Sequence, residues 1–288
     1  MDPEPDKKIV TVQLMGGLGN QLFQIFAAIA YSLRHSAECV LPFQVLGGRP
    51  HYWDSLLKRL VQPFVRVSPP LTKGYTVALR EPHFHYAAIP VPPEDAAVTA
   101  LVGYFQSPRY FADYRAEIME AIGFREQQAR VLAKYGDLLP STVAMHFRRG
   151  DYVKYPQQHP ILPVTYYRSA LLGLPLEGKA RVLYFCEEAD RAHVERHYVG
   201  LLQAEFPHLE FSGVDGAIAD WEQLLIMTLC RDFVIANSSF SWWGAYLSDG
   251  RGSVMCPDAW FGPALRMNST RDLFPSGWTR VLDRAYPA

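Results

Sequence analysis

The second half of the chain alternates short apolar runs with segments of helical spacing, and no other feature restricts the fold as strongly. Runs rich in β-branched and aromatic residues predict strands over 142–147, 182–186, 209–211, 233–236 and 254–256. Apolar side chains three and four positions apart predict helices over 166–172, 189–203, 220–230 and 242–247. Strands that alternate with helices form a parallel sheet with helices on both faces, so we predict an α/β unit.

The N-terminal half opens with a similar unit. Residues 9–15 predict a strand, a glycine turn then breaks it, and a helix follows with Asn20 as its cap. Residues 40–100 contain many prolines and aromatic residues, and there we expect short strands and loops with an aromatic surface. The sequence therefore predicts two lobes, 1–130 and 131–288, that face a cleft.

Composition and charge exclude several classes of protein. The 288 residues carry 28 basic and 29 acidic side chains, so the chain lacks the basic surplus of a nucleic-acid-binding protein. No apolar run approaches the roughly 20 residues of a membrane helix, and the polar, acidic N-terminus does not resemble a signal peptide. The four cysteines lie far apart in apolar stretches, which favours free buried thiols over a zinc site. We expect a cytoplasmic protein in a reducing compartment.

The first candidate ligand-binding segment is the glycine turn after the first strand. Gly17 and Gly19 allow the backbone to approach a ligand closely, and the helix start presents unpaired N–H groups to an anion. Asn20 and Gln21 add side-chain amides. A dinucleotide-binding fingerprint would need a further glycine where Leu22 stands. A tight turn without a ligand is an equal alternative.

The second candidate segment is His146-Phe147-Arg148-Arg149-Gly150-Asp151-Tyr152, directly after a predicted strand. One arginine there can bind a phosphate through its guanidinium fork while the other pairs with Asp151. Parallel α/β sheets bind ligands at this end of their strands, although a surface ion pair is the alternative. His146 is either a buried, hydrogen-bonded histidine or a contact to a nucleotide base or ribose.

The third candidate segment follows the strand predicted over 233–236 and reads Asn237-Ser238-Ser239-Phe240-Ser241-Trp242-Trp243. Small hydroxyl residues at a strand-to-helix turn donate side-chain and backbone hydrogen bonds to an anion. We interpret residues 237–241 as ligand contacts and the two tryptophans as core residues.

Two acidic residues, Asp220 and Glu222, open the helix that precedes the 233–236 strand. Guanine offers a pair of N–H donors that one carboxylate can accept together, so either residue can read the base. The alternative is that both residues only complement the helix dipole.

The three segments together resemble the α-1,2-fucosyltransferases of glycosyltransferase family 11. The chain contains GGLGNQLFQ at Gly16 to Gln24, HFRRGDY at His146 to Tyr152 and NSSFSWWGA at Asn237 to Ala245. They occur in the order typical of the family and span nearly the whole chain; each is moderately specific, and the set is strongly specific. The resemblance implies two Rossmann-like lobes of the GT-B type, with the acceptor side in the N-terminal lobe and GDP-fucose held mainly by the C-terminal lobe.

The resemblance also implies a reaction. L-Fucose would pass from GDP-β-L-fucose to a hydroxyl of a glycan acceptor, O2 of a terminal galactose, with inversion and without a metal or other cofactor. The sequence lacks an Asp-x-Asp pair for a metal, and Asp220-Trp221-Glu222 is the nearest approach. We predict that Arg148 or Arg149 neutralises the β-phosphate, with N–H groups of the 238–241 turn, while Asp151 holds an arginine.

The general base and the acceptor stay open at this point. His51, Asp54, His83 and His85 are candidate bases in the aromatic N-terminal region. A transferase for another GDP-sugar or fucosyl linkage is an alternative function, as is a carbohydrate-binding module. An NAD(P)-dependent oxidoreductase is disfavoured by Leu22.

Overall fold

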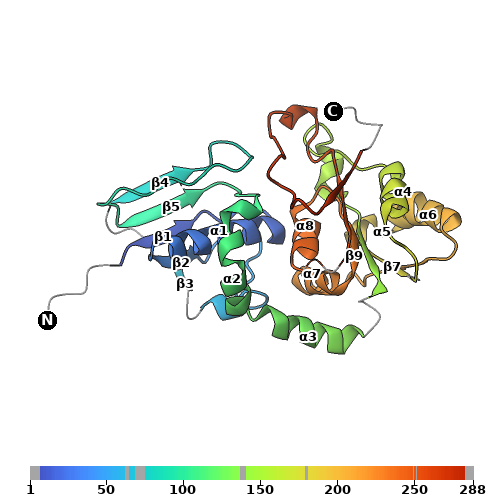
Figure 1. Ribbon diagram of the computed structural model, residues 1–288, viewed down its shortest axis with the longest axis horizontal. Coiled ribbons are helices and arrows are strands. Elements are labelled where there is room, and N and C mark those ends of the chain that lie inside the picture. The colour runs from blue at the N-terminus through green and yellow to red at the C-terminus, as the bar shows by residue number, and fades with distance from the viewer. Residues whose placement is uncertain are drawn as a thin grey trace. The chain divides into compact units, whose positions relative to one another are not determined.

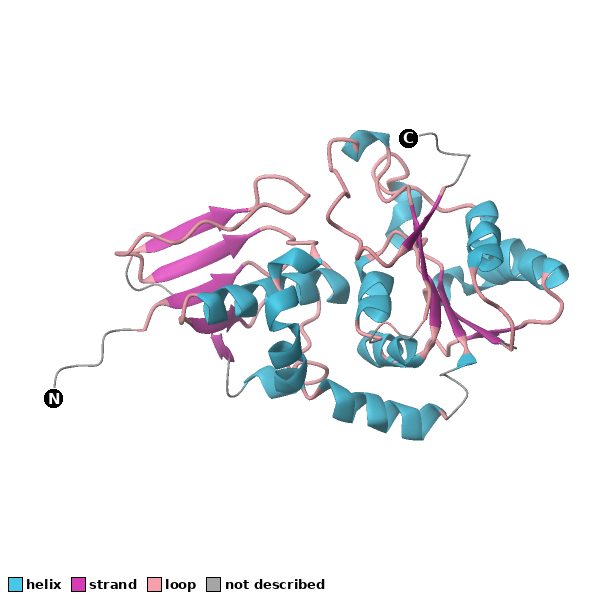
Figure 2. Cartoon of the chain, viewed as in Figure 1, coloured by secondary structure: helices cyan, strands magenta, loops and turns pink. Residues whose placement is uncertain are grey.

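The chain divides into two compact units. The computed structural model describes residues 7–61, 65–68, 75–136, 141–178, 181–248, 250 and 252–282 (Figure 1). The first unit comprises Met1–Gln127 and Asn268–Pro275, and the second comprises Gln128–Met267 and Ser276–Ala288. Both are built from strands and helices (Figure 2). Within the described residues, every helix is too short or too polar to cross a bilayer.

The described part of the first unit is built on five parallel strands in the order β3-β2-β1-β5-β4. The strands are β1 (Ile9–Val12), β2 (Glu38–Pro42), β3 (Val65–Ser68), β4 (Thr76–Arg80) and β5 (Val98–Val102). The longer helices are α1 (Leu18–Arg34), α2 (Arg115–Ile122) and α3 (Phe124–Tyr135), which leads into the second unit. Short 3-10 helices cover Lys58–Val61, Pro108–Tyr110 and Ala112–Tyr114. Helix α1 is apolar on most sides and accordingly buried over nearly its whole length.

The second unit contains six described strands, all parallel, in the order β11-β10-β9-β6-β7-β8. They are β6 (Val143–His146), β7 (Arg181–Phe185), β8 (Glu210–Gly213), β9 (Asp232–Val234), β10 (Val254–Pro257) and β11 (Thr279–Val281). The helices between them include α4 (Val164–Gly173), α7 (Asp220–Leu229) and α8 (Ser239–Tyr246). Counted from β6, this is the doubly wound order 3-2-1-4-5-6, which reverses direction between β6 and β9.

The predicted alternation of strands and helices in the second half is confirmed, with two corrections. The helix predicted over 189–203 is present as one uninterrupted helical segment that contains an unpredicted π-helical turn: α5 (Arg191–Val194), the π-helical turn (Glu195–Val199) and α6 (Gly200–Glu205) follow one another directly. Strand β11 follows β10 and was not predicted, because its three residues carry no recognisable alternation.

The prediction that Asn20 caps the first helix is wrong. Helix α1 begins at Leu18 with Gly17 as its N-cap, so Asn20 lies in the first turn. Gly16 adopts a φ of +80°, and a Cβ there would come within 2.4 Å of the Asn20 amide nitrogen. Glycine alone tolerates this combination, so the chain turns into the helix earlier than the polar residue suggested.

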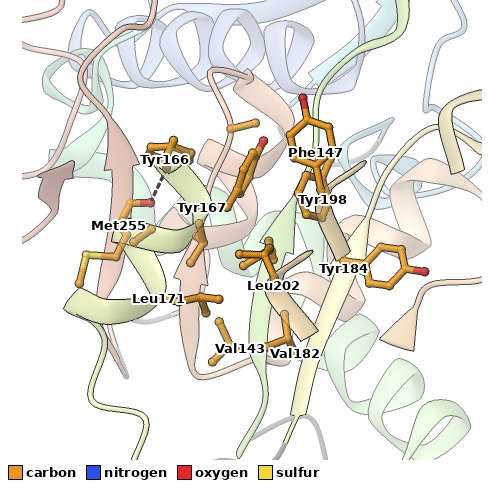
Figure 3. Packing of buried hydrophobic residues seen from close by; sticks show 14 of the residues in the cluster. Val143, Phe147, Tyr166, Tyr167, Leu171, Val182, Tyr184, Tyr198, Leu202 and Met255 are labelled. Atoms are coloured by element: carbon orange, nitrogen blue, oxygen red, sulfur yellow. Dashed lines mark hydrogen bonds between the residues drawn. The ribbon is translucent and has the colours of Figure 1, made fainter. Parts of the chain in front are cut away.

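A core of tyrosines and aliphatic residues lies on one face of the second sheet, where side chains of β6, β7, β9 and β10 pack against α4 and α6 (Figure 3). The hydroxyl of Tyr166 donates to the backbone oxygens of Ile235, at 2.6 Å, and Met255, at 3.3 Å. The hydroxyl of Tyr167 donates to the backbone oxygen of His146 at 3.2 Å. The two tyrosines therefore fix the backbone where β6 and β9 end, and so position the segments that follow.

Candidate functional site

The segments after β6 and β9 meet at the carboxyl end of the second sheet. The two strands pair directly, with Met145 opposite Val234. The Tyr152 hydroxyl donates to the backbone oxygen of Asn237 at 3.0 Å, and the His146 and Phe240 rings lie 5.5 Å apart between centroids. These contacts join the arginine segment to the serine segment at the reversal of strand order, which is where doubly wound sheets bind ligands.

The two adjacent arginines have different surroundings. Arg148 donates from its two terminal nitrogens to the carboxylates of Asp151 and Glu187. The Arg149 side chain is only 17% exposed, and its nearest carboxylate oxygen, on Asp190, lies 3.8 Å from Nε. The backbone oxygen of Arg149 accepts from the N–H of Tyr152 at 2.7 Å, but its guanidinium makes no hydrogen bond to the described residues, and its Nε is buried. The expectation that one arginine pairs with Asp151 therefore applies to Arg148, which leaves Arg149 available for a ligand.

His146 is a buried and neutral imidazole. Burial, assisted by the positive charge of Arg148, lowers its pKa to about 3. Its Nδ1 is buried and has no hydrogen-bond partner among the described residues. The ring can therefore donate or accept one hydrogen bond to a ligand group without changing charge near neutral pH.

Asn237 and the turn after it contain groups that hold the local backbone and one group that has no partner in the described chain. The Asn237 amide nitrogen donates to the backbone oxygens of Pro160, at 3.0 Å, and Trp260, at 3.3 Å, whereas its Oδ1 finds no donor in the described chain. Ser238 is the N-cap of α8 and accepts from the backbone N–H of Phe240 at 3.4 Å.

The remaining residues of this turn separate into core and surface. Ser241 is fully buried, and its hydroxyl donates to backbone oxygens at 3.3 and 3.4 Å, which favours a structural role over the predicted ligand contact. Ser239 and Phe240 are partly exposed at the start of α8. The prediction that Trp242 and Trp243 belong to the core is confirmed, since both are fully buried.

Three buried polar atoms without a partner therefore lie in the two joined segments: His146 Nδ1, Arg149 Nε and Asn237 Oδ1. Buried polar groups in folded proteins are nearly always hydrogen-bonded, and each one left unpaired costs about 1–3 kcal/mol. Their concentration at the reversal of strand order is the geometry expected of a site completed by a polar, anionic ligand.

The glycine turn of the first unit is held mainly by its own amides. The Gln21 side chain is buried and donates to the backbone oxygens of Gly16, at 3.0 Å, and Pro50, at 2.9 Å. The Asn20 Oδ1 accepts from the Gln106 amide at 2.9 Å. Gly17 and Gly19 lie at the start of α1. These contacts favour a loop-supporting role for both amides, and donor binding by this segment stays a prediction.

The acidic residues that open α7 also have local partners. Asp220 accepts from the backbone N–H of Trp221 at 2.7 Å, and Glu222 forms an ion pair with Lys134 at 2.8 Å. The Lys134 contact favours the structural alternative for Glu222. Base recognition by either carboxylate stays a prediction.

The candidate bases all lie in the first unit. Asp54 is exposed, and His51 packs against Phe43 with 4.5 Å between ring centroids. His83 stacks on His85 at 3.5 Å between centroids. No contact within the unit singles out one of them as a base.

Two acidic residues next to the arginines were missed by sequence reasoning. Glu187 and Asp190 follow β7, the strand beside β6. Their signal was an acidic run, Glu187-Glu188-Ala189-Asp190, at the end of a predicted strand. Without the strand order, nothing in the sequence shows that this loop neighbours the arginines.

Comparison with known proteins points to one family. The family described as "Glycosyl transferase family 11" matches residues 71–281. The O-antigen biosynthesis glycosyltransferase WbnK of Escherichia coli is 27% identical over 60% of this chain and 58% of its own length. An alpha-1,2-colitosyltransferase of E. coli is 25% identical over 95% of this chain and 99% of its own length. The rabbit (Oryctolagus cuniculus) galactoside alpha-(1,2)-fucosyltransferase 2 is 25% identical over 85% of this chain and 69% of its own length.

Solved structures share the fold at low sequence identity. The apo form of POFUT1 is 14% identical, with a TM-score of 0.52 over 86% of this chain and 97% of the other. The E. coli ADP-heptose LPS heptosyltransferase II is 11% identical, with a TM-score of 0.51 over 95% of this chain and 90% of the other. The predicted fold class, an α/β protein with two Rossmann-like lobes of the GT-B type, is thereby confirmed.

Proposed function

The chain belongs to glycosyl transferase family 11, and from that premise we propose that it transfers L-fucose from GDP-β-L-fucose to O2 of a terminal galactose on a glycan. The linkage formed is α-1,2, the anomeric carbon is inverted, and no metal takes part. In this proposal the second unit binds the nucleotide and the loops of the first unit bind the acceptor.

The main support for the proposal is that the guanidinium donors of Arg149 are unfilled within the described chain. A guanidinium has five N–H donors, and those of this largely buried side chain make no hydrogen bond to the described residues. A diphosphate can fill two of those donors at once and supply the opposite charge. Arg148 serves this purpose less well, because Asp151 and Glu187 already hold its terminal nitrogens.

The chemistry follows from where negative charge develops. The bond between the fucose anomeric carbon and the β-phosphate oxygen breaks, and its electron pair stays on the phosphate. Arg149 and the N–H groups at the start of α8 stabilise that charge, a contribution that is often the largest in catalysis. The acceptor hydroxyl attacks the opposite face of the sugar and gives its proton to a base or to water.

The names of the relatives support an α-1,2 linkage, and they suggest a second sugar donor to test beside GDP-fucose. Two of them are named as enzymes forming α-1,2 linkages, one with a colitosyl and one with a fucosyl group. The colitosyltransferase aligns over 99% of its length, so another GDP-sugar is the alternative donor. The described cysteines are free thiols, which agrees with the proposed cytoplasmic location.

A donor panel tests this function. The protein is incubated with a β-galactoside and either GDP-fucose or another GDP-sugar, with and without EDTA, and the product linkage is determined by NMR. We expect α-1,2-fucosylation that EDTA does not affect. Loss of activity on chelation, restored by manganese, would contradict the metal-free reaction. Turnover with a different GDP-sugar, and none with GDP-fucose, would show that the proposed donor is wrong. Absence of both GDP binding and turnover on any acceptor would leave the carbohydrate-binding module as the better hypothesis, whereas GDP binding would speak against it.

A substitution of Arg149 tests whether its unfilled donors bind the diphosphate. Arg149→Lys keeps the charge but loses the fork, so we expect at least about a hundredfold lower kcat. Arg168→Lys is the matched control, because Arg168 lies in the same unit and pairs with Glu205 on the surface. Near-normal turnover by Arg149→Lys would refute the role assigned to Arg149.

A further inference from the structure

The loop after β7 places acidic side chains against the arginine segment. Strands β6 and β7 pair in register up to His146 and Phe185, so the loops that follow them leave the sheet side by side. The contact that matters here joins Asp190 of one loop to Arg149 and Gly150 of the other. Asp190 is itself only 18% exposed.

The two carboxylate oxygens of Asp190 have different partners. Oδ2 accepts the backbone N–H of Gly150 at 2.7 Å, a short, charge-assisted hydrogen bond. Oδ1 lies 3.8 Å from Arg149 Nε, which is too far for a hydrogen bond but close enough for strong attraction in a partly buried site. One side chain thus holds both the backbone after Arg149 and the charge of Arg149.

This arrangement restrains Arg149 without occupying its donors. A free arginine side chain has many rotamers, and ordering it on ligand binding would cost conformational entropy. Asp190 restricts the guanidinium beforehand, while the N–H groups stay unfilled by the described protein. Arg148 shows the contrasting case, because its two carboxylate partners consume both terminal nitrogens.

We propose that Asp190 is a positioning residue for Arg149, which it orients so that the guanidinium donors meet the diphosphate of a nucleotide sugar. Its charge holds the guanidinium, and its hydrogen bond to Gly150 fixes the backbone on which Arg149 stands. This inference rests on the proposed function of the site.

Asp190→Asn removes the negative charge of the side chain but keeps its shape. The amide oxygen can still accept from Gly150, but the attraction on Arg149 is lost. We expect kcat to fall about tenfold or more, the KM for GDP-fucose to change less than kcat, and the melting temperature to change little. The matched control is Glu188→Gln, because Glu188 lies in the same loop, loses the same charge, and pairs with Arg191 instead. An equal loss of kcat in both variants would overturn the proposal.

A double-mutant cycle separates this proposal from the function on which it rests. The rates of wild type, Asp190→Asn, Arg149→Ala and the double variant are compared with excess enzyme. If Asp190 acts through Arg149, adding Asp190→Asn to Arg149→Ala lowers the rate no further. If the two losses multiply, the positioning role is refuted while the role of Arg149 stands. If Arg149→Ala retains full activity, the proposed function of the site fails first.

The cycle has a second readout for weakly active variants. Where turnover of Arg149→Ala falls below detection, the dissociation constant of GDP is measured for the same four proteins by calorimetry. Coupled effects on GDP affinity support the proposal, and independent effects overturn it.

Discussion

His146 should make the second unit lose stability on mild acidification. Its buried imidazole has a pKa of about 3 because burial disfavours the charged form and Arg148 adds repulsion. In the unfolded chain the pKa of histidine is about 6.5. Between these values the unfolded state binds more protons than the folded state, so the free energy of unfolding falls as the pH drops from about 6.5 towards 3.

The size of the effect follows from the two pKa values. Between pH 7 and pH 5, the protonation of His146 in the unfolded state lowers the free energy of unfolding by about 2 kcal/mol. Typical domains are stable by only about 5–15 kcal/mol, so this loss is measurable. In His146→Gln the side chain does not titrate, and the pH-dependent loss should be smaller by about 2 kcal/mol.

Tryptophan fluorescence during urea unfolding is a suitable assay, because five of the six tryptophans lie in the second unit: Trp221, Trp242, Trp243, Trp260 and Trp278. The free energy of unfolding is measured at pH 7 and pH 5 for wild type and His146→Gln. The exposed His208 provides the control variant His208→Gln. Equal losses of stability in wild type and His146→Gln would refute the reasoning.

Three further substitutions test the surroundings of the site. Gly150→Ala should destabilise the protein by about 1–3 kcal/mol and reduce kcat, because Gly150 has a φ of +39° and a Cβ would lie 2.5 Å from a Glu187 oxygen; unchanged kcat and melting temperature would contradict this. Asn237→Ala should cost about 2–4 kcal/mol in urea unfolding, since it leaves two backbone oxygens without their donor; full stability would show that water replaces the amide. Tyr166→Phe should cost about 1 kcal/mol through loss of the 2.6 Å bond to Ile235, with GDP affinity unchanged in calorimetry; weakened GDP binding would show that this tyrosine also shapes the site.

Local sequence patterns determined the elements of the second unit and the chemistry of its edge. Apolar spacing and β-branched runs depend only on neighbouring residues, so the alternation from β6 to β10 could be predicted. Polar residues directly after a strand are also a local pattern, so the arginine and serine segments could be predicted as candidate ligand-binding segments. Where a backbone feature overrode the pattern, as at Gly16, the prediction for Asn20 failed.

Tertiary structure alone decided which of these residues are in contact and which of them keep unfilled hydrogen-bond donors. Strand order depends on packing between segments far apart in the chain, so only the fold could place Asp190 beside Arg149, or return residues 268–275 to the first unit. Two adjacent arginines look equivalent in sequence, yet carboxylates from two different loops occupy Arg148 while Arg149 keeps its donors. The availability of a charged group is set by its neighbours in space, and a linear pattern does not contain them.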